Sequence, residues 1–326
     1  MTTAGAVPAE QLGRILPHEH IYINEMLEDR AGGLLNDAGL MAAELVAFAA
    51  AGGGTIVELT TAELTAGAAP DPRGLYGGGP GSGFPEHGTR AASNVVALAR
   101  LAEQSGVRIV LGTGHYRDPY LEAEPMDRRS TDELAELMVR DLVEGFPGTG
   151  VRAGVIGEVG ADKWFVSAIE ERSIRAAARA SLATGAAITT HASKWPVGGD
   201  VLELLLKEGV APERVIVGHV STIDIPEYHL DMAGRGAWVQ LDTIRGGPGP
   251  VVDRWVSQVM ALVRAGHLER ILLSHDVCLK SHLRVNGGCG YGYLLEEFLP
   301  LLQRAGLTAG EVDQLVRANP QRAFAS

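Results

Sequence analysis

The stretch RAGVIGEVGADKW (152–164) places one carboxylate at the end of a short apolar run. Residues 153–156 are typical of a buried β-strand, and Glu158 follows them among glycines. An unpaired buried charge is costly, so this acid needs a partner.

Strand-like apolar runs alternate with amphipathic helical segments along the whole sequence. The expected strands are 14–19, 55–60, 107–112, 153–159, 186–191, 214–219, 236–242 and 270–275. The expected helices are 39–51, 90–105, 131–145, 168–184, 199–209, 225–235, 251–266, 292–305 and 308–318. This alternation predicts an α/β protein with a parallel sheet. Eight units favour a (β/α)8 TIM barrel forming a single domain over 1–326, although a doubly wound open sheet would alternate in the same way.

Residues 66–88 (AGAAPDPRGLYGGGPGSGFPEHG) interrupt the alternation. This Gly/Pro-rich insertion follows the second expected strand, so in a barrel it lies at the carboxyl-terminal face, where active sites are found. Long segments without regular structure are often functional, and the insertion is either a lid over the site or a tolerated surface loop.

Composition excludes several classes of function. The 326 residues are 46% apolar and carry a formal net charge of −12, which argues against a nucleic-acid or anionic-membrane partner. The N-terminus lacks a basic segment followed by a long apolar core, and no apolar run approaches the roughly 20 residues of a membrane span. The two cysteines, Cys278 and Cys289, are expected to be reduced and unpaired. We therefore expect a soluble, cytoplasmic protein with a small-molecule substrate; a homodimer remains open.

Potential metal ligands lie at the ends of several expected strands. They are His18 and His20 in PHEH, Glu158, His191 in TTHAS, His219 in VGHVS and Asp276 in LLSHDV. A barrel gathers all strand ends around one mouth, and residues two apart on a strand share a face. Imidazoles with carboxylates suit zinc and related divalent ions. Because six ligands exceed one tetrahedral site, the set predicts two metals that share Glu158 as a bridge.

The remaining histidines have no comparable grouping. They are His87, His115, His229, His267, His275 and His282. A lone histidine at a strand end is more often structural than a ligand. His275 directly precedes Asp276, so the strand pattern predicts that it points away from the site.

The chain resembles the phosphotriesterase family of the amidohydrolase superfamily, from LPHEH (16–20) to NPQRAF (319–324). The most specific stretches are AARASLATGAAITTHAS (177–193), SHDVCLKSHL (274–283) and GGCGYGYLLEEFLPLL (287–302). The resemblance implies that His18, His20 and Asp276 bind a buried metal and that His191 and His219 bind an outer one. The organophosphate-degrading and acyl-homoserine-lactone-hydrolysing members carry a carboxylated lysine at the bridging position. Glu158 stands there instead, as in the phosphotriesterase homology proteins.

This resemblance implies a hydrolase with two divalent ions, zinc first and manganese or cobalt as alternatives. A metal-bridging hydroxide would attack the substrate, and Asp276 would accept the proton. The expected substrate is a small ester, most plausibly a lactone, with or without an anionic group. Alternatives are an N-acyl amino acid-type amide, promiscuous phosphotriester hydrolysis and, last, a non-catalytic binding barrel.

Three further residues are candidates for substrate contact. Tyr116, in GTGHYRDP, could bond a carbonyl oxygen or be a core residue. Arg245, in LDTIRGG, could bind an anionic substituent or be a solvated loop residue, and Lys163 is a weaker candidate of the same kind.

Overall fold

The computed structural model describes residues 1–70, 89–121, 126–247 and 249–325, so most of the insertion expected at 66–88 lies outside the described residues. Eight strands form one sheet in the order β1-β4-β5-β6-β7-β8-β9-β10, and every hydrogen-bonded pair in it is parallel. The strands are β1 (Arg14–Glu19), β4 (Gly53–Glu58), β5 (Arg108–Thr113), β6 (Val155–Gly160), β7 (Ile188–His191), β8 (Val215–Val217), β9 (Trp238–Leu241) and β10 (Ile271–Leu273). All eight expected strands are present.

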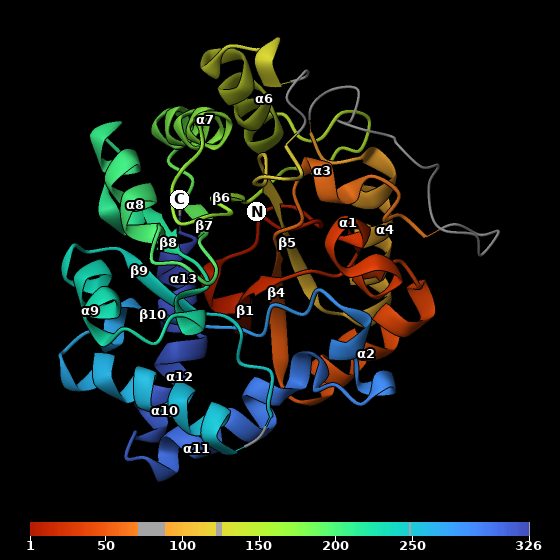
Figure 1. Ribbon diagram of the computed structural model, residues 1–326. Helices are drawn as coiled ribbons and strands as arrows, with labels where there is room; N and C mark the ends of the chain where they lie inside the picture. The colour runs from red at the N-terminus through yellow and green to blue at the C-terminus, as the bar shows by residue number, and fades with distance from the viewer. Residues whose placement is uncertain (71–88, 122–125, 248, 326) are drawn as a thin grey trace.

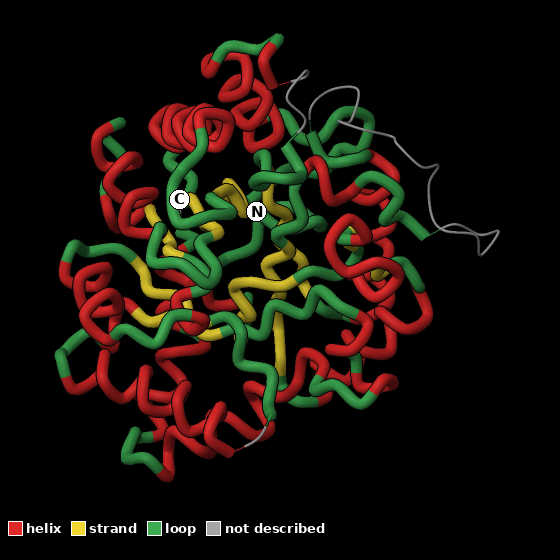
Figure 2. Tube along the Cα trace, viewed as in Figure 1, coloured by secondary structure: helices red, strands yellow, loops and turns green. Residues whose placement is uncertain are grey.

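Helices surround the sheet on its outer side (Figures 1 and 2). The longer ones are α2 (Ala38–Ala50), α4 (Ala92–Ser105), α6 (Thr131–Val143), α7 (Ala168–Thr184), α8 (Gly198–Lys207), α9 (Pro226–Gly234), α10 (Gly249–Arg264), α11 (Leu299–Arg304), α12 (Ala309–Val316) and α13 (Ala318–Ala323). The first and last strands of the sheet, β1 and β10, meet beside the hydrogen bond that the amide of Asp276 donates to the carbonyl oxygen of His18 (3.2 Å). This arrangement confirms the (β/α)8 barrel. Among the described residues, no helix is both long and apolar enough to cross a bilayer.

The sequence did not predict the small elements beside the barrel mouth. They are the antiparallel pair β2 (Ile23–Asn24) and β3 (Leu34–Leu35) and the single-turn helices α1 (Met26–Asp29) and α3 (Ala62–Thr65). All four lie in the segments that follow β1 and β4. Elements this short have too few residues to show a periodic pattern.

Two apolar clusters hold the barrel together. The larger packs the outer face of the sheet against the helices. The smaller includes one residue from each strand or from the position just before it, together with Leu59 and Ala323; the strand residues are Ile15, Val57, Val110, Val155, Ala187, Ile216, Trp238 and Leu272. Such a layer fills the interior of a barrel, so polar side chains nearer the carboxyl ends of the strands sit on an apolar floor.

Candidate metal centre

The six predicted ligands lie together at the carboxyl ends of five strands. His18 belongs to β1 and His20 follows it, Glu158 belongs to β6 and His191 to β7. His219 and Asp276 come two and three residues after β8 and β10, and both have a backbone φ of 56°. The left-handed conformation is uncommon for residues other than glycine and often marks functional sites.

Glu158 is the centre of the group. Its Oε2 lies 3.0 Å from His219 Nε2, 3.1 Å from His191 Nδ1 and 3.3 Å from His18 Nε2. Its other oxygen, Oε1, lies 3.6 Å from His20 Nε2. One carboxylate therefore faces all four imidazoles, and its two oxygens turn toward different parts of the cluster.

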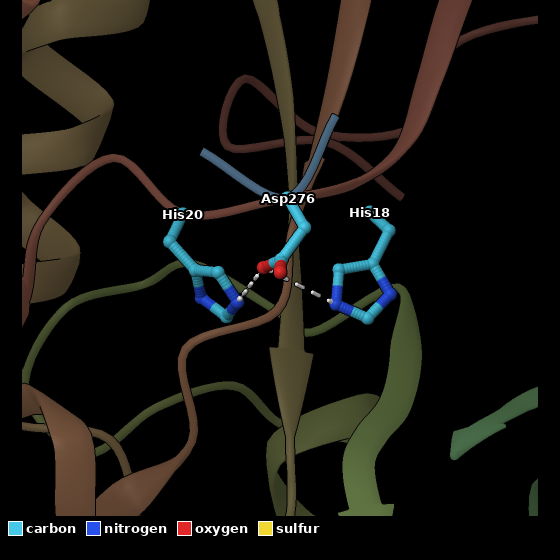
Figure 3. A group of neighbouring side chains, drawn as sticks. All are labelled: His18, His20 and Asp276. Carbon is cyan, nitrogen blue, oxygen red and sulfur yellow. Dashed lines mark ion pairs between the residues drawn. The ribbon is translucent and has the colours of Figure 1, made fainter. Parts of the chain in front are cut away.

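Asp276 completes the side of the cluster that β1 forms. Its Oδ1 lies 3.4 Å from His20 Nε2 and 3.9 Å from His18 Nε2. Figure 3 shows the carboxylate between the two rings. This side offers two nitrogens and one oxygen, while His191 and His219 provide a second side next to Glu158.

Hydrogen bonds behind the cluster fix the tautomers of three histidines. His18 Nδ1 faces Gln240 Oε1 (3.1 Å) and Asp242 Oδ2 (3.2 Å), and His219 Nδ1 faces Asp242 Oδ1 (3.0 Å). Because these partners are acceptors, each Nδ1 donates to them, and a neutral ring would keep its Nε2 lone pair for a metal ion. Such outer partners orient metal-binding histidines.

His20 is fixed in the same way through a hydroxyl group. Thr60 donates its only proton to Glu58, so its oxygen accepts from His20 Nδ1 (3.0 Å). Glu58 is in turn paired with the buried guanidinium of Arg90. His191 differs, since it turns Nδ1 toward Glu158.

The electrostatics of the cluster are those of a site that needs a cation. Burial opposes ionisation of Glu158, but His18 and His191 outweigh it and hold its pKa well below its usual range. Burial likewise opposes protonation of His20 and His219, yet their acidic neighbours raise the pKa of His20 to about 10 and that of His219 to about 9. Burial, reinforced by positive His219, lowers the pKa of His191 to about 3.

The donor set fits a binuclear metal site. Three groups have ligand atoms within 4.8 Å of one another: His18, His20 and Asp276; His18, His219 and Asp242; and Glu158, His191 and His219. His18 Nε2 is buried and has no hydrogen-bond partner among the described residues. Three carboxylates, Glu158, Asp242 and Asp276, face these imidazoles, and among the described residues only Asp276 has a guanidinium, that of Arg245, within 4.0 Å. A divalent ion would satisfy the open nitrogen and offset the excess acid.

The glycines beside Glu158 give the backbone the room it needs. A Cβ on Gly157, which has φ +125°, would lie 2.3 Å from the carbonyl oxygen of Thr189. A Cβ on Gly160 would lie 2.0 Å from that of His191. Any side chain at either position would push β6 away from β7 and move Glu158 relative to His191.

The three candidate substrate contacts occupy different positions. Tyr116 is buried, and its hydroxyl lies 3.2 Å from His191 Nδ1. Arg245 donates to the carbonyl oxygen of Asp276 (2.9 Å), and its Nη1 lies 3.8 Å from Asp276 Oδ2. Lys163 has a half-exposed side chain, and its ammonium lies 4.0 Å from Asp118 Oδ2 and 5.8 Å from the centre of the Phe165 ring. The structure thus brings Tyr116 and Arg245 to the cluster but not Lys163.

Sequence reasoning missed several residues that support the cluster. Asp242 ends the seventh expected strand, so its position at a strand end is the signal that identifies it. Glu19 lies between two predicted ligands, His18 and His20. Because side chains alternate along a strand, its place in the sequence predicts only that it lies on the opposite face from them. Glu25 is buried near the cluster, and burial raises its pKa to about 7. It lies in a loop, where no strand pattern identifies it.

The chain is similar to known proteins over most of its length. The model of the phosphotriesterase family matches residues 86–324. The phosphotriesterase homology protein of Escherichia coli (strain K12) is 37% identical over 231 residues, 71% of this chain and 79% of that protein. Its crystal structure, with phosphate in the active site, has a TM-score of 0.82 at 30% identity and covers 97% of this chain and 99% of that one.

Two further proteins are similar over nearly the whole chain. The N-acetyltaurine hydrolase of Danio rerio is 26% identical over 320 residues, 94% of this chain and 79% of that protein. The lactonase Lmo2620 of Listeria monocytogenes has a TM-score of 0.81 at 24% identity and covers 99% of this chain and 98% of that one. At that identity the likeness to the lactonase is one of fold.

Proposed function

The chain belongs to the phosphotriesterase family, and we propose that it hydrolyses a small carboxylic ester, a lactone first, that carries an anionic group. Members of this family are metal-dependent hydrolases, and the clusters described above could hold metal. The observation that carries the proposal is the single carboxylate, Glu158, in contact with four imidazoles.

We assign the ligands of the two ions by side of the cluster. His18, His20 and Asp276 would hold one ion, His191 and His219 the other, and Glu158 would join them. Mixed nitrogen and oxygen donors favour zinc, with manganese or cobalt as alternatives. When bound, such a pair of ions acidifies water and polarises a carbonyl group.

The protein side chains then handle the proton and the substrate. Burial opposes ionisation of Asp276, but His20 and Arg245 lower its pKa to about 2, so its carboxylate is an ionised acceptor. Asp276 would accept the proton of the attacking water and deliver it to the leaving group. The hydroxyl of Tyr116 would donate a hydrogen bond to the substrate carbonyl, and the guanidinium of Arg245 would face the anionic group.

An N-acyl amino acid-type amide is the second candidate substrate. The relatives named N-acetyltaurine hydrolase favour it, because they match this chain over 94% of its length or more in several vertebrates. The same residues would serve this amide, because an N-acyl amino acid, like the anionic ester, has a carbonyl group, then a leaving group, and then an anionic group. Among the candidate substrates, phosphotriesters are the least favoured, because Glu158 replaces the lysine of the organophosphate-degrading members.

A substrate panel tests the proposal directly. Protein loaded with Zn²⁺ or Mn²⁺ is assayed on lactones, linear esters, N-acyl amino acids, N-acyl sulfonates and phosphotriesters, each anionic compound with a neutral analogue. We expect turnover of anionic carbonyl substrates that is lost in Asp276→Asn. Metal analysis accompanies the assay. Fewer than one tightly bound metal per chain, or no turnover of any carbonyl substrate, would contradict the proposal.

A further inference from the structure

Glu19 separates the two histidines of PHEH and turns its side chain away from them. It is fully buried and accepts four hydrogen bonds from the segment after β10. Its Oε1 accepts from Ser274 Oγ (2.7 Å), the amide of His275 (2.8 Å) and His275 Nδ1 (3.0 Å). Its Oε2 accepts from the amide of Val277 (2.8 Å).

All four partners of Glu19 are donors. The amide of Leu294 donates to His275 Nε2 (2.8 Å), so the ring proton is on Nδ1 and points to Glu19. His275 therefore faces Glu19 and Leu294 and not the metal cluster, as its place next to Asp276 predicts. A carboxylate offers two acceptor oxygens for these four bonds, whereas an amide side chain offers one.

Two of these donors are the peptide N–H groups on either side of Asp276. The amide of Asp276 itself donates to His18 (3.2 Å). The three consecutive amides of residues 275–277 are thus all hydrogen-bonded. The backbone of Asp276 adopts φ 56°, a conformation that persists only when neighbours enforce it. We propose that Glu19 is a positioning residue: it fixes the 275–277 backbone so that the carboxylate of Asp276 faces His18 and His20. This inference rests on the proposed function, in which Asp276 is a metal ligand.

The matched test compares two buried glutamates in the full-length protein. Glu19→Gln keeps the volume but turns an NH₂ group toward amide donors. Glu170→Gln is the control, because Glu170 is also buried and accepts the amides of Asp118 (3.1 Å), Asp162 (2.8 Å) and Ser167 (2.9 Å), none of them a predicted ligand. The readouts are the Zn²⁺ affinity, measured by competition with a chromophoric chelator, and the thermal midpoint of the metal-free protein.

We expect Glu19→Gln to weaken Zn²⁺ binding by roughly tenfold or more, as is usual when an outer partner is lost, and Glu170→Gln to leave it unchanged. Similar thermal shifts in both variants with unchanged affinity in both would overturn the positioning role. Asp276→Ala separates the two proposals. If it retains full Zn²⁺ affinity, the metal site itself is wrong. If it loses affinity while Glu19→Gln does not, only the role of Glu19 fails.

Hydrogen exchange tests the inference without a variant. In metal-free wild-type protein we expect the amides of His275 and Val277 to be protected as strongly as those of the barrel strands, because Glu19 holds them. Rapid exchange that slows only after Zn²⁺ is added would show that the metal orders this segment, and it would overturn the proposal.

Discussion

The inner cluster (His18, His20, Glu158, His191, His219 and Asp276) and the outer rim (Lys163, Trp164, Phe165 and Arg245) differ in how firmly they are held. Glu158 and His18 are at most 1% exposed, and each has several fixed partners. Trp164 is 67% exposed and packs against Phe165. Strands and the one to three residues that follow them fix the inner cluster, whereas loops present the outer rim. We infer that the inner cluster determines the reaction and the outer rim selects the substrate.

The largest expected effect comes from removing the centre of the inner cluster. Glu158→Ala takes away the group that faces four imidazoles, and we expect loss of bound metal and at least about a thousandfold loss of turnover. The fold should persist, because the apolar layer below the site is untouched. Metal analysis, turnover and circular dichroism measure these outcomes. Glu171→Ala, at a half-exposed position on α7, is the control; full activity in Glu158→Ala would contradict the bridging role.

The pH dependence of stability distinguishes the metal-free from the metal-loaded inner cluster. Acidic neighbours raise the pKa of His20 to about 10 and that of His219 to about 9, against an unfolded value of 6.5. The folded metal-free protein therefore holds protons that the unfolded chain releases, and this stabilisation is present below pH 6.5 and lost as the pH rises through about 9 to 10. With Zn²⁺ bound the imidazoles are neutral and the decline should disappear. Thermal midpoints measured with chelator and with Zn²⁺ should diverge over this range; parallel curves would contradict it.

Asp242 links the two sides of the inner cluster, and its loss should have an intermediate effect. Its two oxygens hold Nδ1 of His18 and of His219, so Asp242→Asn disturbs one ligand on each side. We expect metal affinity and turnover to fall by about 10- to 100-fold. Asp231→Asn on α9 is the same substitution at an exposed position and should change neither. Equal behaviour of the two variants would mean that Asp242 does not orient the ligands.

The fold was predictable because eight apolar runs alternate with helices. The inner cluster was also predictable, because its residues stand at strand ends and a barrel brings strand ends together. Simple strand alternation does not explain why the side chains of the inner cluster face the interior of the barrel. Val155 lies in the interior layer, so alternation would place Gly157 and not Glu158 on that face. The pairing of β6 with β7 shifts register between Ile156 and Val159, and a shift of this kind turns the following side chains to the other face.

The support behind the inner cluster was harder to predict. Glu19 points to the outer face of β1, and its four donors lie about 255 positions away in sequence. The register of β1 against β4 also shifts, between Leu16 and Glu19. A single sequence shows neither the shift nor the distant donors. The partners of Arg245 and Lys163 depend on loop geometry, for which the sequence has no periodic pattern.

Arg245 connects the outer rim to the inner cluster, and its substitution tests where the boundary lies. If Arg245 binds the anionic group, Arg245→Met should raise KM for an anionic substrate by about tenfold, the effect of one lost charged hydrogen bond, with a smaller change in kcat. A neutral analogue of the same substrate is the control, and its KM should not change. Equal losses on both substrates would show that Arg245 acts through Asp276, whose carbonyl oxygen it contacts at 2.9 Å.

Lys163 should show the smallest effect. Its side chain is 52% exposed, and its ammonium lies 4.0 Å from Asp118. An exposed pair of this kind contributes little, so we expect Lys163→Met to change stability by less than about 0.5 kcal/mol and KM by less than about threefold. Thermal unfolding and KM for anionic and neutral substrates measure this. A tenfold rise in KM for the anionic substrate alone would mean that Lys163 reaches the bound substrate. The loop after β6 would then select the substrate together with Arg245, and the rim would extend around the mouth from β6 to β9.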